Sequence, residues 1–112
     1  MISLLSEPRL EVERQRSSLV LWVCHPFDDH YSFRTLFAGI TTVLQRSRPV
    51  SLTLPSEAPS EDFVEGVLHW GPSIYQVYYE RSLGYVEISS AEGPAVHELL
   101  AVLRDAFSWT AS

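Results

Sequence analysis

The sequence predicts an α+β fold, in which a single, largely antiparallel sheet of about six strands carries two amphipathic helices packed on one face. Apolar residues recur at three- and four-residue spacing in two segments, which indicates helices. In the other apolar segments these residues alternate with polar ones or run continuously, as they do in strands. The elements follow in the order β-β-α-β-β-β-β-α, and the last three strands are joined by short turns. Such turns are typical of an antiparallel meander.

The first two predicted strands form a hairpin. Residues 9–13 alternate between apolar and charged side chains, which is typical of a half-buried strand. Residues 19–24 (LVLWVC) are apolar on both faces, which is typical of a central strand. The polar residues 14–18 between them can turn the chain, and no element is assigned to residues 1–6.

The first helix is predicted between Pro26, which breaks the preceding strand, and Pro49, which stops the helix. Asp28 or Asp29 is expected to cap its first turn by accepting hydrogen bonds from free amides. Its apolar residues give one wide stripe, which is the strongest periodic signal in the chain. The stripe consists of Phe33, Leu36, Phe37, Ile40, Val43 and Leu44.

Four more strands and a second helix follow. The strands are predicted at residues 50–54, 63–70, 74–80 and 85–89. Gly93-Pro94 opens the second helix, because proline is favoured in a first helical turn, and the apolar stripe of this helix extends to Phe107. The polar loop at 55–60 is too short to separate two domains, so we expect residues 1–112 to form one domain.

One face of this sheet has no predicted cover. Each helix has a single apolar stripe, and two helices do not suffice to cover both faces of a six-stranded sheet. The other face must therefore be solvated, curved or covered by a partner. The alternating aromatics of residues 63–70 and 74–80 supply both faces, so some of them are expected to lie on the open one.

The charge of the chain is concentrated in its second half. The 112 residues include 14 acidic and 8 basic side chains, for a net charge of −6, and every basic residue is an arginine. Residues 1–48 carry a net charge of +1, whereas residues 49–112 carry −7. Like charges of this kind keep a surface soluble, and they can also attract a cationic partner.

Composition excludes several classes of function. The acidic balance argues against a nucleic-acid partner, which requires a basic surface. No apolar run approaches the roughly 20 residues that cross a bilayer, and we expect neither a secretory signal nor a membrane partner. The single cysteine cannot form an internal disulfide, which fits a reducing compartment, so we expect a cytoplasmic protein.

Reactive side chains are densest between the second strand and the first helix. A helix N-terminus can lower the pKa of a thiol, and a nearby histidine can act as a base, so a small thiol-dependent enzyme is one interpretation. A metal site is another, with the ligands Cys24, His25, Asp28 and His30. The simplest interpretation is a buried Cys24 beside a helix cap, with no metal and no cofactor. The spacing matches no zinc motif, and glycine-rich phosphate loops are absent, so the chain is expected not to be an enzyme.

Acidic and aromatic residues carry the remaining functional signal. Aromatic side chains anchor interfaces, and a rim of one charge sign speeds encounter with an oppositely charged partner. The predicted partner-binding residues are Glu57, Glu61, Asp62, Glu65, Trp70, Tyr78 and Glu80. We therefore expect a non-enzymatic domain that occludes a basic protein. A homodimer that pairs through the uncovered sheet face is the alternative.

In size, acidity and lack of a catalytic signature, the chain is similar to small cytoplasmic immunity proteins. Such proteins neutralise bacterial toxins, often cationic nucleases, by covering them. The resemblance implies a toxin or nuclease as the basic partner. The use of arginine without lysine, and the absence of asparagine, would suit a GC-rich bacterial gene.

Overall fold

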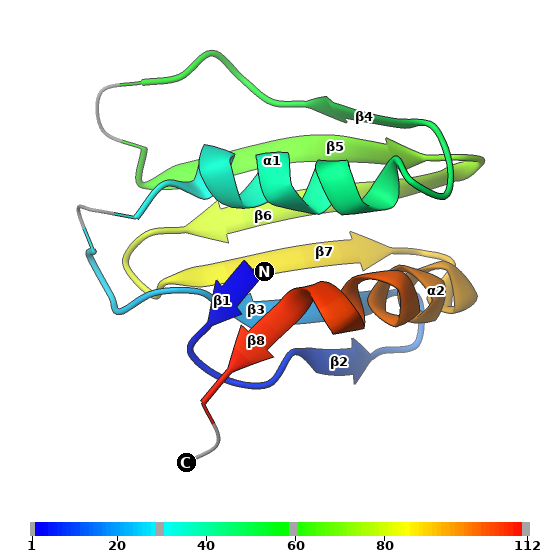
Figure 1. Cartoon of the computed structure of the whole chain (residues 1–112), viewed down its shortest axis with the longest axis horizontal. Coiled ribbons are helices and arrows are strands. Elements are labelled where there is room, and N and C mark those ends of the chain that lie inside the picture. The colour runs from blue at the N-terminus through cyan, green and yellow to red at the C-terminus, as the bar shows by residue number, and fades with distance from the viewer. Residues whose placement is uncertain (1, 29–30, 59–60, 111–112) are drawn as a thin grey trace.

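Six antiparallel strands form the main sheet of the computed structural model, which describes residues 2–28, 31–58 and 61–110. In their order across the sheet, the strands are β2 (Arg9–Val12), β3 (Ser17–Trp22), β7 (Tyr85–Ser90), β6 (Ser73–Glu80), β5 (Phe63–Trp70) and β4 (Val50–Thr53). The hairpin β2–β3 therefore pairs with the end of the meander through β7, and β4 closes the opposite edge (Figure 1).

Two helices lie side by side on one face of this sheet (Figure 1). Helix α1 spans Phe33–Leu44 and packs near β4, whereas α2 spans Gly93–Leu103 and packs on β3 and β7. The predicted α+β class is confirmed, as is the order of the six main-sheet strands and the two helices. The predicted cap of α1 is wrong, because the N-cap is Ser32, whose side chain accepts a hydrogen bond from the amide of Thr35. A hydroxyl next to the first turn satisfies that amide. Asp29, the other predicted cap, lies outside the described residues.

A second, two-stranded sheet is a feature that the sequence pattern did not predict. Strand β1 (Ile2–Leu4) pairs in parallel with β8 (Phe107–Trp109), so the two ends of the described chain lie side by side. Helix α2 ends earlier than the pattern indicated, and a 3₁₀ turn at Arg104–Ala106 leads into β8. Leu4 and Phe107 are buried, so this ribbon extends the core on the helix side of the sheet.

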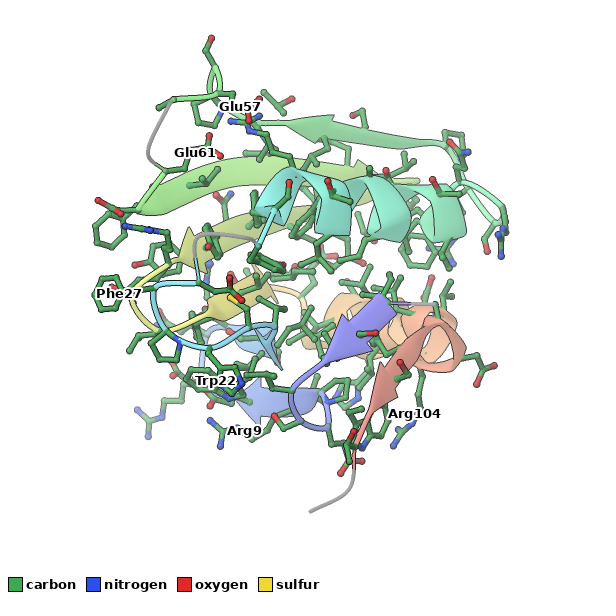
Figure 2. All side chains as sticks on the ribbon, turned by 60° about the vertical axis from the view of Figure 1, so that its left-hand side comes forward. Arg9, Trp22, Phe27, Glu57, Glu61 and Arg104 are labelled. Atoms are coloured by element: carbon green, nitrogen blue, oxygen red, sulfur yellow. The ribbon has the colours of Figure 1, made fainter. Side chains whose placement is uncertain are left out.

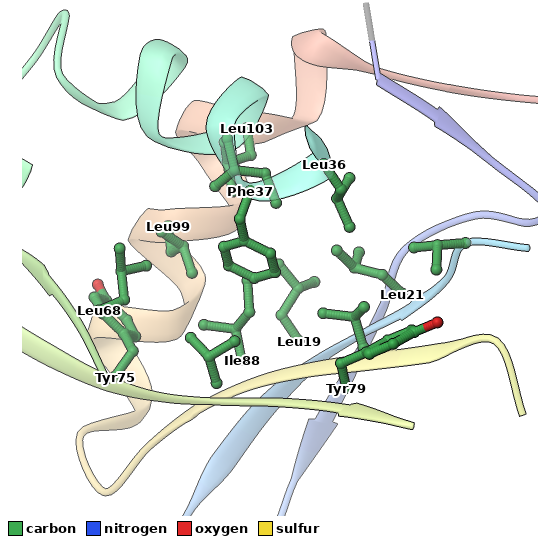
Figure 3. Packing of buried hydrophobic residues seen from close by; sticks show 14 of the residues in the cluster. Leu19, Leu21, Leu36, Phe37, Leu68, Tyr75, Tyr79, Ile88, Leu99 and Leu103 are labelled. Atoms are coloured by element: carbon green, nitrogen blue, oxygen red, sulfur yellow. The ribbon is translucent and has the colours of Figure 1, made fainter. Parts of the chain in front are cut away.

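The core fills the space between the sheet and the two helices (Figure 3). The sheet contributes the side chains that alternate toward the helices, and the helices contribute their apolar stripes. Fully buried examples are Leu19, Leu21, Phe37, Ile40, Leu68, Ile88, Leu99 and Leu103. Two side chains tie the layers together: Trp70 Nε1 donates to the carbonyl of Leu44 at 3.0 Å, and Tyr75 Oη donates to that of Ala95 at 2.8 Å.

Within the described ranges, neither helix has the length and apolar character needed to cross a membrane.

Candidate functional site

The face of the main sheet that points away from the helices carries two rows of side chains, defined by strand register. Across β5, β6, β7, β3 and β2, one row runs Glu65, Tyr78, Glu87, Val20 and Arg9. The neighbouring row runs Phe63, Glu80, Tyr85 and Trp22. No helix among the described residues covers these rows, because α1 and α2 both lie on the other side (Figure 1). We call this surface the open face.

Four aromatic rings form a continuous stripe across the open face. The ring centroids of Trp22 and Tyr85 are 5.0 Å apart, those of Tyr85 and Tyr78 are 6.3 Å apart, and those of Tyr78 and Phe63 are 6.3 Å apart. Aromatic pairs at such distances attract one another through their ring edges and faces. The stripe is partly exposed along its length and most exposed at Phe63, where 61% of the residue is accessible. It therefore presents rigid apolar area to solvent.

Carboxylates alternate with these rings. Glu65 and Glu87 lie directly opposite Tyr78 on its two neighbouring strands, and Glu80 lies between Phe63 and Tyr85. This arrangement avoids a pair of carboxylates directly opposite each other, which would be destabilising. Burial and the charges of Glu80, Glu65 and Glu87 together raise the pKa of Tyr78, so the stripe lies in a negative field.

Glu87 is the most firmly held of these carboxylates. Its Oε1 accepts a hydrogen bond from Ser18 Oγ at 3.1 Å, and its Oε2 accepts one from the hydroxyl of Tyr85. Burial, followed by the hydrogen bond to Glu87, raises the pKa of Tyr85, which keeps that hydroxyl protonated and donating. The position of Glu87 is therefore fixed from two sides, and the remaining hydrogen-bonding capacity of its oxygens stays on the open face.

A hollow of about 360 Å³ lies over this part of the sheet. Glu65, Tyr78, Glu87 and Arg16 are among the residues that line it, and Arg16 donates from Nη1 to Ser89 Oγ at 2.6 Å. A cationic side chain in the hollow would meet an aromatic ring and two carboxylates against the single guanidinium of Arg16, so the charged lining still favours a guanidinium or ammonium group.

The structure brings together three of the residues that the sequence predicted for partner binding. Glu65, Tyr78 and Glu80 share the open face. Glu57 is exposed in the loop after β4. Figure 2 shows it near Glu61, at the opposite edge of the molecule from the open-face residues Trp22 and Arg9. Asp62, directly before β5, accepts at Oδ1 from Arg81 Nε at 3.0 Å, so its charge is paired within the chain.

Glu61 has a structural role in this fold. Its Oε1 lies 2.6 Å from Nη2 of Arg34 in α1, and the same nitrogen donates to the carbonyl of Pro55 at 2.8 Å. Both side chains of the pair are partly buried. The hydrogen bond from Arg34 lowers the pKa of Glu61, which therefore stays ionised and holds the loop after β4 against the helix.

Trp70 was predicted to bind a partner, but it does not lie on the open face. Its side chain is fully buried on the helix side of the sheet, where the guanidinium of Arg48 lies 4.4 Å from its ring. It anchors the core and has no accessible surface for a partner. Conversely, the prediction omitted Trp22, Phe63, Tyr85 and Glu87. Alternation along each strand could have grouped them, but only the register shows that they adjoin Tyr78.

The segment around Cys24 does not form an activated site in the described part of the chain. Cys24 is a free, buried cysteine, and burial together with the charge of Asp28 raises the pKa of its thiol. A raised pKa disfavours the nucleophilic thiolate. His25 is exposed, and His30 lies outside the described residues. Within residues 2–28, 31–58 and 61–110, no group of three or more histidine, cysteine, aspartate or glutamate side chains is arranged to hold a metal ion.

Comparison with models of protein families, with curated proteins and with solved structures found no match to this chain.

Proposed function

We propose that this chain is a non-enzymatic protein-binding domain whose open face occludes a basic protein partner. The observation that carries the proposal is the row in which Tyr78 lies between Glu65 and Glu87 over a hollow of about 360 Å³. The aromatic stripe supplies anchor area, and the carboxylates supply charge complementarity toward arginine and lysine side chains.

The charge of the open face favours a cationic partner over a second copy of the chain. A two-fold axis through this face would place Glu65, Glu80 and Glu87 near the same residues of the other copy. Arg9 would offset little of this repulsion, because its Nη2 is already 2.7 Å from Glu11 Oε1 on the same strand. A positively charged surface meets no such repulsion.

A toxin of the kind that small immunity proteins neutralise is the finer form of this proposal. A basic nuclease fits because it presents arginine and lysine side chains where it binds nucleic acid. Support for this form rests on the chemistry of the open face and on the small size and acidity of the chain. Neutralisation would then follow from covering that surface.

The proposal is tested by titrating ¹⁵N-labelled chain with an oligo-arginine peptide at low and high salt. We expect amide shifts in β5, β6 and β7 at the open-face positions, and weaker binding as salt rises. Replacing Glu65→Gln and Glu80→Gln together should weaken binding several-fold. The matched control is Glu57→Gln with Glu98→Gln, which changes the net charge equally but away from the open face, and which should bind nearly as wild type does.

Equal loss in both double variants would show attraction to net charge alone, and shifts confined to other surfaces would place binding elsewhere. Either result would overturn the proposal. The finer form is tested with the product of a toxin-like gene next to the one that encodes this chain. Mixing the two should abolish the toxin's activity, and the Glu65→Gln, Glu80→Gln variant should protect less.

A further inference from the structure

Phe27 has a backbone conformation that is costly for its residue type. Its φ is 57°, and it is the only residue other than glycine with a positive φ among those described. The amide of Asp28 donates to the carbonyl of His25 at 3.1 Å, so Pro26 and Phe27 occupy the centre of a tight turn. In a turn with positive φ at its third residue, glycine is the favoured residue there. A bulky side chain at this position therefore strains the backbone.

Burial of the Phe27 ring does not offset this strain, since 62% of the residue is exposed. Its amide donates to the carbonyl of Arg81 at 3.0 Å, and the Arg81 guanidinium carbon lies 5.7 Å from the ring centroid. Figure 2 shows the ring projecting from the end of the sheet, away from the helices. The fold thus holds an apolar ring in solvent in a fixed place.

Two further exposed apolar side chains lie at the same end of the sheet. Phe63 begins β5 directly after Asp62, whose carbonyl accepts from the amide of Arg81 at 2.9 Å, and Leu83 lies in the turn between β6 and β7. Six large apolar side chains are exposed among the described residues, and three of them are Phe27, Phe63 and Leu83. We call these three the end patch. Phe63 also belongs to the aromatic stripe, so the end patch continues the open face.

We propose that the end patch is the apolar anchor point of the docking surface and receives a bulky aliphatic side chain that adjoins basic residues on the partner. This inference rests on the proposed function and specifies the partner further, as a basic surface that carries an exposed apolar residue. Anchors of this kind contribute a large share of binding energy when a partner desolvates them. The strained backbone of Phe27 is then explained by recognition.

The test compares two arginine-rich peptides of equal charge, one with a central Leu-Leu pair and one with Ser-Ser. Wild-type chain should bind the Leu-Leu peptide about 5-fold more tightly, which is the effect of partly burying one such side chain. Phe27→Gly suits the turn and should melt no lower than wild type, yet it should lose most of this preference. Leu83→Ser should lose part of it. Val12→Ser is the control, because Val12 is 69% exposed on β2 at the opposite end of the sheet.

Each outcome separates the two proposals. Equal affinity of wild type for both peptides, or a Leu-Leu preference that persists in Phe27→Gly and Leu83→Ser, would overturn the anchor point and leave the basic partner standing. A preference lost equally in Val12→Ser would also overturn it. Failure to bind either peptide would overturn the proposed function, and the anchor point with it.

Discussion

At the scale of single residues, Gly84 is the position where one added methyl group is expected to cost most. Its φ is +60°, and a Cβ there would lie 1.9 Å from the carbonyl oxygen of Cys24. Both the turn after β6 and the chain after β3 would have to move. We expect Gly84→Ala to lower the free energy of unfolding by about 3 kcal/mol or more, as measured by urea denaturation.

Gly39 is the matched control for that substitution. It lies inside α1, and a Cβ there would make ordinary contacts at 3.6 Å with Ile2. Gly39→Ala should therefore raise stability by about 0.5–1 kcal/mol, which is the helix propensity difference. A similar cost at both positions would contradict the steric account of Gly84.

Tyr31 carries a buried hydroxyl that has no hydrogen-bond partner in the described structure. Burial raises the pKa of this phenol strongly, so the group stays neutral, but its desolvation is not compensated. Tyr31→Phe removes the oxygen and keeps the ring contact with Tyr79, whose centroid is 5.8 Å away. We expect unfolding to cost about 1 kcal/mol more in this variant.

Tyr75→Phe provides the comparison, because the hydroxyl of Tyr75 donates to the carbonyl of Ala95. That variant should lose about 1 kcal/mol, since a buried carbonyl loses its donor. Thermal or urea unfolding of the two variants beside wild type measures both effects. If Tyr31→Phe is as destabilising as Tyr75→Phe, its hydroxyl has a partner in solution.

At the scale of elements, the pair Arg34–Glu61 connects α1 to the loop before β5. Glu61→Gln keeps the shape of the side chain and removes its charge, so we expect a loss of about 0.5–1 kcal/mol at pH 7. The pKa of Glu61 is lowered in the folded chain. The stabilisation is therefore present above the ordinary carboxyl pKa and disappears as the pH falls through the lowered folded value.

This pH dependence gives the measurement its control. The difference in unfolding free energy between wild type and Glu61→Gln should shrink as the pH is lowered from 7 through the lowered pKa of Glu61, because the protonated Glu61 is then uncharged, as the glutamine is. Glu57→Gln changes an exposed carboxylate of the same loop and should leave stability nearly unchanged. A difference that stays constant with pH would assign the effect of Glu61→Gln to packing alone.

The elements differ in how far their residues could predict them. Helix α1 has a stripe with full helical period, and β5 and β6 alternate over eight residues each, so local pattern suffices for these elements. Strands β1 and β8 have three residues each and pair in parallel between distant parts of the chain. Three residues carry almost no periodicity, and the pairing goes with burial of Leu4 and Phe107 in the core, which a local pattern does not reveal.

At the scale of the whole molecule, the need for an open face followed from counting elements, but its contents did not. Two helices with one apolar stripe each cover only one face of a six-stranded sheet, and this follows from the number of predicted elements alone. Trp70 and Tyr78 show what was missing, since both are aromatic residues within the meander, yet one is buried and the other lies on the open face. Residue type does not tell which face is inside, because that depends on the side to which the chain crosses after β3.

The association state of the free chain tests this whole-molecule view. We expect a monomer at micromolar concentration and neutral pH, because a net charge of −6 and the carboxylates of the open face repel a second copy. Sedimentation velocity at low salt measures this directly, and raising the salt checks whether screening alone permits pairing. A dimer at low salt that Tyr78→Glu dissociates would favour the homodimer over the basic partner. A dimer that persists in that variant would place the contact away from the open face, which would then still be accessible to a cationic protein.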